Sequence, residues 1–212
     1  FGFILPFCVL ANLGYGSLDI WINADLISAI KNTIIVSGLA AFITVLLGLL
    51  MVYGIRLSGR SLPQAILPLT TIGYAAPGAV LGIGILVPLG IVDNWMADRV
   101  FDLTGYDPGL IFTGTAFAII LAYCVRFFSI AQHTVDGAFG RISPSLPNAA
   151  QSLGRNKLQV LLQIYRPLIS TSTATALLLI FVDCVKELPA TMLLRPFNFE
   201  TLATRVHVQA SL

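Results

Sequence analysis

Three ionisable residues close to the end of a long apolar run have the type and spacing to do chemistry. Asp183, Lys186 and Glu187 lie at i, i+3 and i+4, which predicts that they share one face of a helix. An ionisable side chain inside a membrane span costs roughly 2.5–3.5 kcal/mol on insertion scales, and it usually faces the bundle interior or water. Two interpretations stay open. The three groups shape a pathway or gate, or Lys186 neutralises a neighbouring carboxylate and fixes helix packing.

The other side chains that could do chemistry do not converge. His133 and His207 are single, and Cys8, Cys124 and Cys184 are far apart, each within an apolar run. This spacing predicts neither a metal site nor a disulfide framework. The sequence contains no G-x4-G-K-[S/T] phosphate-binding motif. We therefore expect no catalytic residue, no metal ligand and no cofactor bound by this chain.

The composition indicates what kind of structure positions the charged residues. Of 212 residues, 57% are hydrophobic and only 10% are charged, and the mean hydropathy is +0.88. A soluble domain carries about 25% charged residues, so this chain has too few charges to cover a surface that faces water. The composition predicts an integral membrane protein, and a net charge of +2 gives no reason to expect nucleic acid as a partner.

Four apolar segments are long enough to cross a bilayer as helices, which takes about 20 residues. They are residues 33–55, residues 65–92, residues 108–125 and the segment that begins at Pro167. Residues 1–28 predict a partial first transmembrane helix followed by an external interfacial segment. We therefore expect an all-α bundle with about five spans present and a final span missing, and residues 29–212 form its core.

The second of these segments carries helix breakers but no charge. We expect residues 65–92 to form one helix that is broken near Pro77, with its freed backbone groups hidden in protein or in a water-filled cavity. Gly78 and Gly82 form a small-xxx-small pair, which lets another helix approach closely.

The charges between the spans predict the topology. Arg56 and Arg60 follow the first complete span and segment 126–166 is rich in Lys and Arg, whereas segment 93–107 is acidic. Cytoplasmic loops are enriched in Lys and Arg, so we expect the two basic regions inside and the acidic region outside. Asp183 then lies about 24 Å along the last span, toward its outer half.

The polar segment 145–167 predicts two short helices on the cytoplasmic side. The first has an apolar stripe at i, i+3, i+4 and i+7, formed by Leu146, Ala149, Ala150 and Leu153. We expect Ser145 to cap this helix and Gly154 to end it in the left-handed conformation. A stripe with two alanines is shallow, so a partner surface can approach the backbone closely.

Asn156 is expected to cap the second helix, with Gln159 in capping-box position. Pro167 is expected to end that helix and to begin the next span. Such a rigid elbow can transmit a push from a cytosolic partner. The pattern also suits an amphipathic loop that lies on the membrane or packs on its own bundle.

The segment resembles the signature loop of binding-protein-dependent ABC importer permeases, E-A-A-x3-G-x9-I-x-L-P. The positions that carry the resemblance are Asn148, Ala149, Ala150, Gly154, Ile164 and Pro167, with Leu153 on the same stripe. Asn148 stands where the family usually has Glu, and Arg166 where it has Leu. The stretch from Lys186-Glu187-Leu188-Pro189 to Arg205, together with residues 141–146, is similar to the ferric-iron type of these permeases.

The resemblance implies a polytopic transmembrane helix bundle of the type I ABC importer permease kind, in the bacterial cytoplasmic (inner) membrane and surrounded by lipid. It implies that a coupling loop, residues 132–167, docks on cytosolic ABC ATPase subunits, which use the ATP. A periplasmic substrate-binding protein and a second permease half, fused or separate, are the other implied partners. Tight coordination of iron by Asp183, Lys186 or Glu187 is not expected, because a permeant ion must leave its site.

Ferric iron is the first candidate substrate, and thiamine, sulfate, molybdate, phosphonate and polyamines stay open. A secondary transporter or channel without ATPase partners is the rival from another class, and the loop spacing argues against it. A membrane-embedded enzyme lacks a catalytic cluster.

Overall fold

The computed structural model describes residue 2 and residues 4–15, 24–58 and 67–211, and these residues form helices and no strand. The elements in chain order are α1 (Ile4–Tyr15), α3 (Ala24–Ser58), η1 (Leu67–Thr71), α5 (Ile72–Ala75), α6 (Gly78–Thr104), α7 (Ala116–Gly140), α8 (Ser145–Ser152), α9 (Lys157–Val160), η2 (Leu161–Tyr165), α10 (Arg166–Val185), α11 (Pro189–Leu194) and α12 (Leu202–Ala210). The predicted all-α class is confirmed for the described residues.

Four helices in the described part of the chain are long and apolar enough to cross a membrane. They are Ala24–Arg56, Gly78–Thr104, Ala116–Gly140 and Lys157–Val185. Helix α1 has 12 residues and is too short to span a bilayer by itself. Parts of two expected features, the interfacial segment within residues 1–28 and the loop at Arg60, lie outside the described residues.

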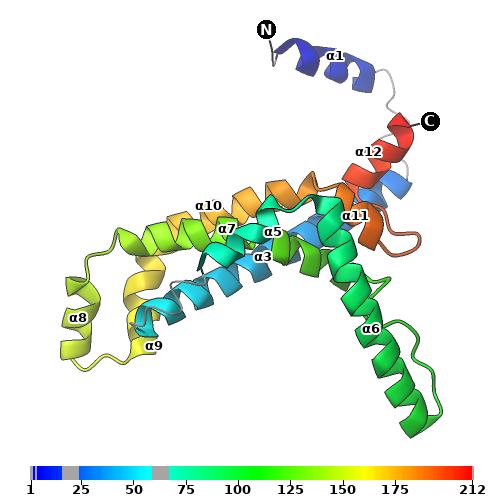
Figure 1. Ribbon diagram of the computed structural model, residues 1–212. Helices are drawn as coiled ribbons and strands as arrows, with labels where there is room; N and C mark the ends of the chain where they lie inside the picture. Colours follow the sequence, from blue (N-terminus) through cyan, green and yellow to red (C-terminus); the bar gives the residue numbers. More distant parts are fainter. Residues whose placement is uncertain (1, 3, 16–23, 59–66, 212) are drawn as a thin grey trace.

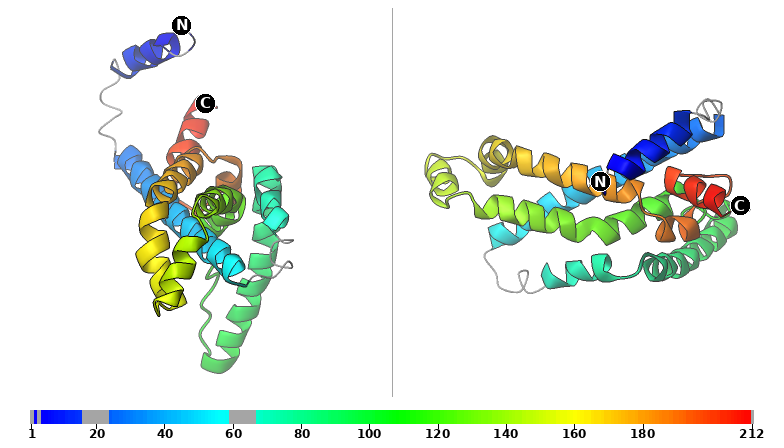
Figure 2. Two further views of the ribbon diagram at one scale, coloured as in Figure 1. Left: turned by 90° about the vertical axis from the view of Figure 1, so that its left-hand side faces the viewer. Right: turned by 90° about the horizontal axis from the view of Figure 1, so that it is seen from above.

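Helices α3, α7 and α10 lie side by side as the centre of the bundle (Figures 1 and 2). Their contacts are made by small residues: Ala40, Ala118 and Ala176 are all 0% exposed. A Cβ added to Gly48 would lie 2.9 Å from the Cβ of Ala131, so α3 and α7 touch almost backbone to backbone. Small interfacial residues favour such packing in lipid, where burial of apolar surface gives little driving force.

The expected break near Pro77 is confirmed. Elements η1 and α5 precede it, Ala76 is extended with ψ 137°, and α6 begins at Gly78 and leaves the bundle at an angle (Figure 1). The predicted ends of two spans are wrong, however. Helix α6 continues through the acidic segment to Thr104, and α7 occupies Ala116–Gly140 instead of residues 108–125. Asp93 and Arg126 do not mark these helix ends, because each has a partner inside the protein.

Asp93 is the first such charge, and it anchors the loop between α6 and α7. Its side chain is fully buried and accepts hydrogen bonds from the backbone N–H groups of Ile111 (3.1 Å), Phe112 (2.8 Å) and Thr113 (2.6 Å). The Thr113 hydroxyl donates a fourth. These bonds hold the loop against α6 two residues before Thr115, whose side chain caps α7.

We expect Asp93→Asn to lower the free energy of unfolding by about 2–3 kcal/mol. The asparagine amide has one acceptor oxygen where the aspartate carboxylate has two. Its NH₂ group would face backbone N–H donors of residues 111–113, and those donors would lose a charged acceptor. Thermal unfolding of the purified protein in detergent measures the change. Asp98→Asn is the matched control, because Asp98 is exposed on the same helix. An equal loss in both variants would contradict the anchoring role of Asp93.

The stretch that resembles the ferric-iron permeases closes the end of the bundle opposite α8 (Figure 1). Leu202 N–H donates to Thr33 Oγ1 over 2.8 Å, and Asn32 Nδ2 donates to the carbonyl of Glu200 over 3.1 Å. Arg205 Nη1 lies 3.1 Å from Glu200 Oε2. These contacts attach α12 to the start of α3.

Candidate coupling element and charge cluster

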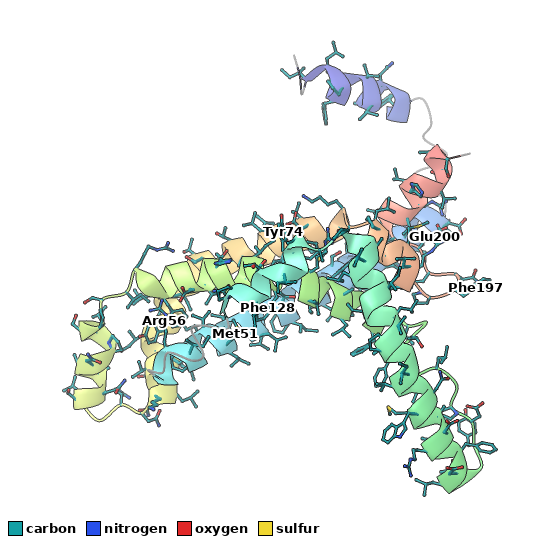
Figure 3. All side chains as sticks on the ribbon, viewed as in Figure 1. Met51, Arg56, Tyr74, Phe128, Phe197 and Glu200 are labelled. Atoms are coloured by element: carbon teal, nitrogen blue, oxygen red, sulfur yellow. The ribbon has the colours of Figure 1, made fainter. Side chains whose placement is uncertain are left out.

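The two groups of residues selected from the sequence lie at opposite ends of the bundle. Figure 3 shows Arg56 at the end that carries α8 and α9, and Glu200 and Phe197 at the end that carries α11 and α12. The coupling element is defined here as residues 145–167.

Helix α8 presents most of its predicted stripe to the outside. Leu146 is 50% exposed, Leu153 is 84% exposed and Ala149 is also exposed. Only Ala150 of the stripe is buried, and it shares the inward face with Pro147. The expected N-cap is wrong, since Ser145 is already helical and Pro144 occupies the cap position without a side-chain bond. The outward residues leave an apolar strip beside the polar surface of the elbow.

The turn after α8 is fixed by backbone hydrogen bonds. Gly154 has φ +82°, as predicted, its N–H donates to Gln151 O over 2.9 Å, and Arg155 N–H donates to Ala150 O over 3.0 Å. This pair of bonds is the Schellman motif, which ends a helix at a left-handed residue. The predicted capping box follows, with Asn156 Oδ1 accepting from Gln159 N over 2.8 Å and Gln159 Oε1 accepting from Asn156 N over 3.0 Å. The elbow therefore has one defined angle.

The second short helix does not end at Pro167. Residues 157–185 form one continuous helix, with a π-helical turn, η2, at Leu161–Tyr165. Arg166 N–H reaches back to Leu161 O, an i→i−5 bond. Proline lacks an N–H and crowds the carbonyl four residues earlier, and the wider π turn accommodates both defects. Ile164 is half-buried in that turn, and Pro167 is exposed in the first turn of α10.

The base of the elbow is attached to α3 and α7. Tyr53 Oη of α3 donates to Lys157 O over 2.5 Å, and the ring centroid of Phe139 in α7 lies 4.6 Å from that of Tyr165 in η2. A cavity of about 320 Å³ lies between this base and α8, and Asn148 is among its lining residues. The position where the family pattern has Glu therefore lines a cavity beneath α8.

Two of the three predicted cluster residues form a pair at the end of α10 that is far from the elbow. Lys186 Nζ lies 2.7 Å from Asp183 Oδ1, and that carboxylate raises the pKa of Lys186 by hydrogen bonding and by its charge. Lys186 is 71% exposed. Glu187 does not join them, because α10 ends at Val185 and the three residues do not share a helix face.

Glu187 instead pairs with a residue that the sequence reasoning did not select. Its Oε2 lies 3.2 Å from Arg126 Nε, near the middle of α7, with the two side chains 8% and 19% exposed. Among the described residues this Nε has no hydrogen-bond partner, so the pair is held by charge and not by an aligned bond. Arg126 Nη1 donates to Ala76 O over 2.9 Å. The arginine thus satisfies the carbonyl freed by the helix break.

Gly78 and Gly82 provide the space for this cluster. A Cβ on Gly78 would lie 2.6 Å from Glu187 Oε1, and a Cβ on Gly82 would lie 3.1 Å from Leu193 Cδ1 of α11. The predicted close approach at this pair of glycines is confirmed. We call Ala76, Gly78, Arg126 and Glu187 the junction cluster, because it joins the helix break, α7 and the α10–α11 turn. The sequence offered one signal for Arg126: a lone cation in an apolar run requires a buried partner.

The arrangement of four helices that are long and apolar enough to cross a membrane, an elbow at one end of the bundle and a helix break near Pro77 has a counterpart among known proteins. Residues 44–195 match the protein family described as "Binding-protein-dependent transport system inner membrane component". The chain belongs to this family. As one of these inner membrane components, it is a multi-pass protein of the cytoplasmic membrane, and its family is one of transport and not of catalysis.

Curated relatives of this inner membrane component include iron and sulfate permeases. It is 30% identical over 183 residues to the Fe(3+)-transport system permease protein FbpB 2 of Haemophilus influenzae, in an alignment that covers 86% of this chain and 33% of the relative. It is 26% identical over 175 residues to the sulfate transport system permease protein CysT of Salmonella typhimurium, covering 81% of this chain and 60% of that one. The chain spans about a third of the length of the first of these relatives.

A solved structure has the same fold. A chain in the crystal structure of the bacterial alginate ABC transporter, in complex with alginate pentasaccharide-bound periplasmic protein, superposes with a TM-score of 0.73 at 17% identity. The superposition covers 99% of this chain and 79% of that chain. The two chains therefore share a fold.

Proposed function

We propose that this chain is the permease part of an ATP-driven importer, that it forms the translocation pathway, and that it performs no bond chemistry itself. The coupling element docks on a cytosolic ATPase subunit, which uses the ATP. A periplasmic binding protein delivers the substrate, and a second permease half completes the pathway.

One continuous helix is the observation that carries the proposal. It starts at Lys157, directly after the capping box of the elbow, and ends at Val185, two residues before Glu187. A helix of that length is about 43 Å long. A push on α8 is passed through the fixed Schellman turn to the base of this helix, and along it to the junction cluster. The exposed strip of Leu146, Ala149 and Leu153 supplies the surface for the ATPase.

The α10 end of the junction cluster suits a gate. Glu187 leaves α10 just past its last residue, and its partner Arg126 bonds the break between α5 and α6. A small movement of α10 therefore changes the distance between two buried charges. Asp183 and Lys186 lie next to this point and are proposed to line the outer part of the pathway.

Ferric iron is the proposed substrate, supported by the curated relatives and by the Lys186–Arg205 stretch. Sulfate is the second candidate because of the CysT relative. We expect ATP-dependent uptake of labelled ferric iron by proteoliposomes that contain the complete transporter and its binding protein, with none when ATP is left out. Uptake that persists without ATP would favour a secondary transporter, and uptake of labelled sulfate in place of iron would overturn the substrate.

A further inference from the structure

An apolar groove lies between α3 and α10 at the end of the bundle next to the elbow. Its volume is about 490 Å³, and leucines of both helices form its walls, including Leu46, Leu50, Leu162 and Leu177. Ser170 and Thr173 also line it, but their hydroxyls donate to backbone carbonyls of α10 and need no further partner. The groove therefore offers hydrocarbon-like walls along its length.

Arg166 is the one charged side chain that lines this groove among the described residues. It is exposed, and within the part of the chain that the structure covers it has no ion-pair or hydrogen-bond partner. In the resemblance described above, this position is the one where leucine is replaced by arginine. A ligand with an apolar body and an anionic head would match both the apolar walls of the groove and the positive charge of Arg166.

The part of the groove between Arg166 and Leu177 matches one leaflet of a bilayer in length. From Arg166 to Leu177 the helix rises about 16 Å. The hydrocarbon core of a membrane is about 30 Å thick, so this rise is close to half of it. Arg166 stands at the elbow end, on the cytoplasmic side, where basic pockets between transmembrane helices bind anionic lipid headgroups.

We propose that the groove between α3 and α10 binds an anionic phospholipid of the cytoplasmic leaflet, with its phosphate on Arg166 and an acyl chain along the leucine walls. On the elbow side of its phosphate, the bound lipid contacts Leu161 and Leu162 of the π turn, which also line the groove. It thereby stabilises the joint between the elbow and α10. This last step rests on the proposed coupling function, whereas lipid binding itself does not.

The test compares lipids retained by the full chain purified in mild detergent. Native mass spectrometry of the protein mixed with phosphatidylglycerol or phosphatidylcholine gives the occupancy of each lipid. We expect about a five-fold preference for phosphatidylglycerol, equal to about 1 kcal/mol for one arginine close to an anionic surface. Arg166→Leu should remove the preference, and Arg155→Gln, at an exposed arginine that does not line the groove, should keep it.

A second variant addresses the acyl chain. Ala174→Phe places a large side chain in the groove and should reduce retention of both lipids, whatever their headgroup. The proposal is overturned if Arg166→Leu keeps the wild-type preference or if Ala174→Phe retains both lipids normally. Disulfide formation in membranes between Leu50→Cys of one copy and Ala174→Cys of another would also overturn it, because a protein helix would then occupy the groove. None of these outcomes depends on transport, so the coupling proposal is tested separately.

Discussion

Replacing Gly154 with valine is expected to abolish substrate uptake while the chain remains in the membrane. Gly154 has φ +82°, a conformation that is costly for a β-branched residue by about 1–2 kcal/mol or more. The Schellman turn would open, and α8 would lose its fixed angle to the continuous helix. ATP hydrolysis by the partner should then continue without transport, measured as the ratio of ATP hydrolysed to substrate taken up in proteoliposomes.

The control for this variant is Gly154→Asn. No atom lies within 4 Å of a Cβ at this position, so a side chain costs only backbone strain. Asparagine adopts the left-handed conformation more readily than other non-glycine residues, so it should keep most of the uptake. If the Gly154→Val variant takes up substrate at the wild-type rate, the fixed angle of the elbow is not needed for transport. Equal loss in both variants would point to crowding by the partner and not to the turn.

The elbow could be predicted from the sequence because its determinants are local. The glycine and the Asn156–Gln159 capping box each act within about one helical turn and the apolar stripe within about two, and their residue types leave few alternatives. The π turn could not be predicted in the same way. Pro167 normally ends a helix, and the continuation depends on a wider turn before it and on contacts with a distant helix, such as Tyr53 of α3 with Lys157.

The junction cluster could not be predicted in full because its members are far apart in the sequence. Arg126 stood at the end of an apolar run and was therefore predicted to end a span. In the structure it lies inside α7, since Glu187 compensates its charge and Ala76 accepts its hydrogen bond. Asp93 shows the same effect in α6, where backbone donors from residues 111–113 replace water. A charged residue in an apolar run therefore has two interpretations: it marks the end of a span, or it lies inside the span with a buried partner.

Glu187→Gln is expected to give the largest loss of stability among substitutions in the junction cluster. The change leaves Arg126 buried without its counter-charge, and breaking one side of a buried pair typically costs about 3–5 kcal/mol. Transport should fall, while binding of the ATPase at the other end of the bundle persists. Asp183→Asn is the control, because its partner Lys186 is 71% exposed and an exposed pair contributes at most about 1 kcal/mol.

Stability and gating are separated by the double variant Arg126→Gln with Glu187→Gln. Removing both charges of a buried pair is often close to neutral for stability, and the amide at position 126 can still donate toward the carbonyl of Ala76. We expect thermal stability to return to nearly the wild-type value while transport stays low, because the two charges would no longer respond to movement of α10. If transport recovers together with stability, the pair serves packing alone, and the gate must then be sought at Asp183 and Lys186, the charged pair at the same end of α10.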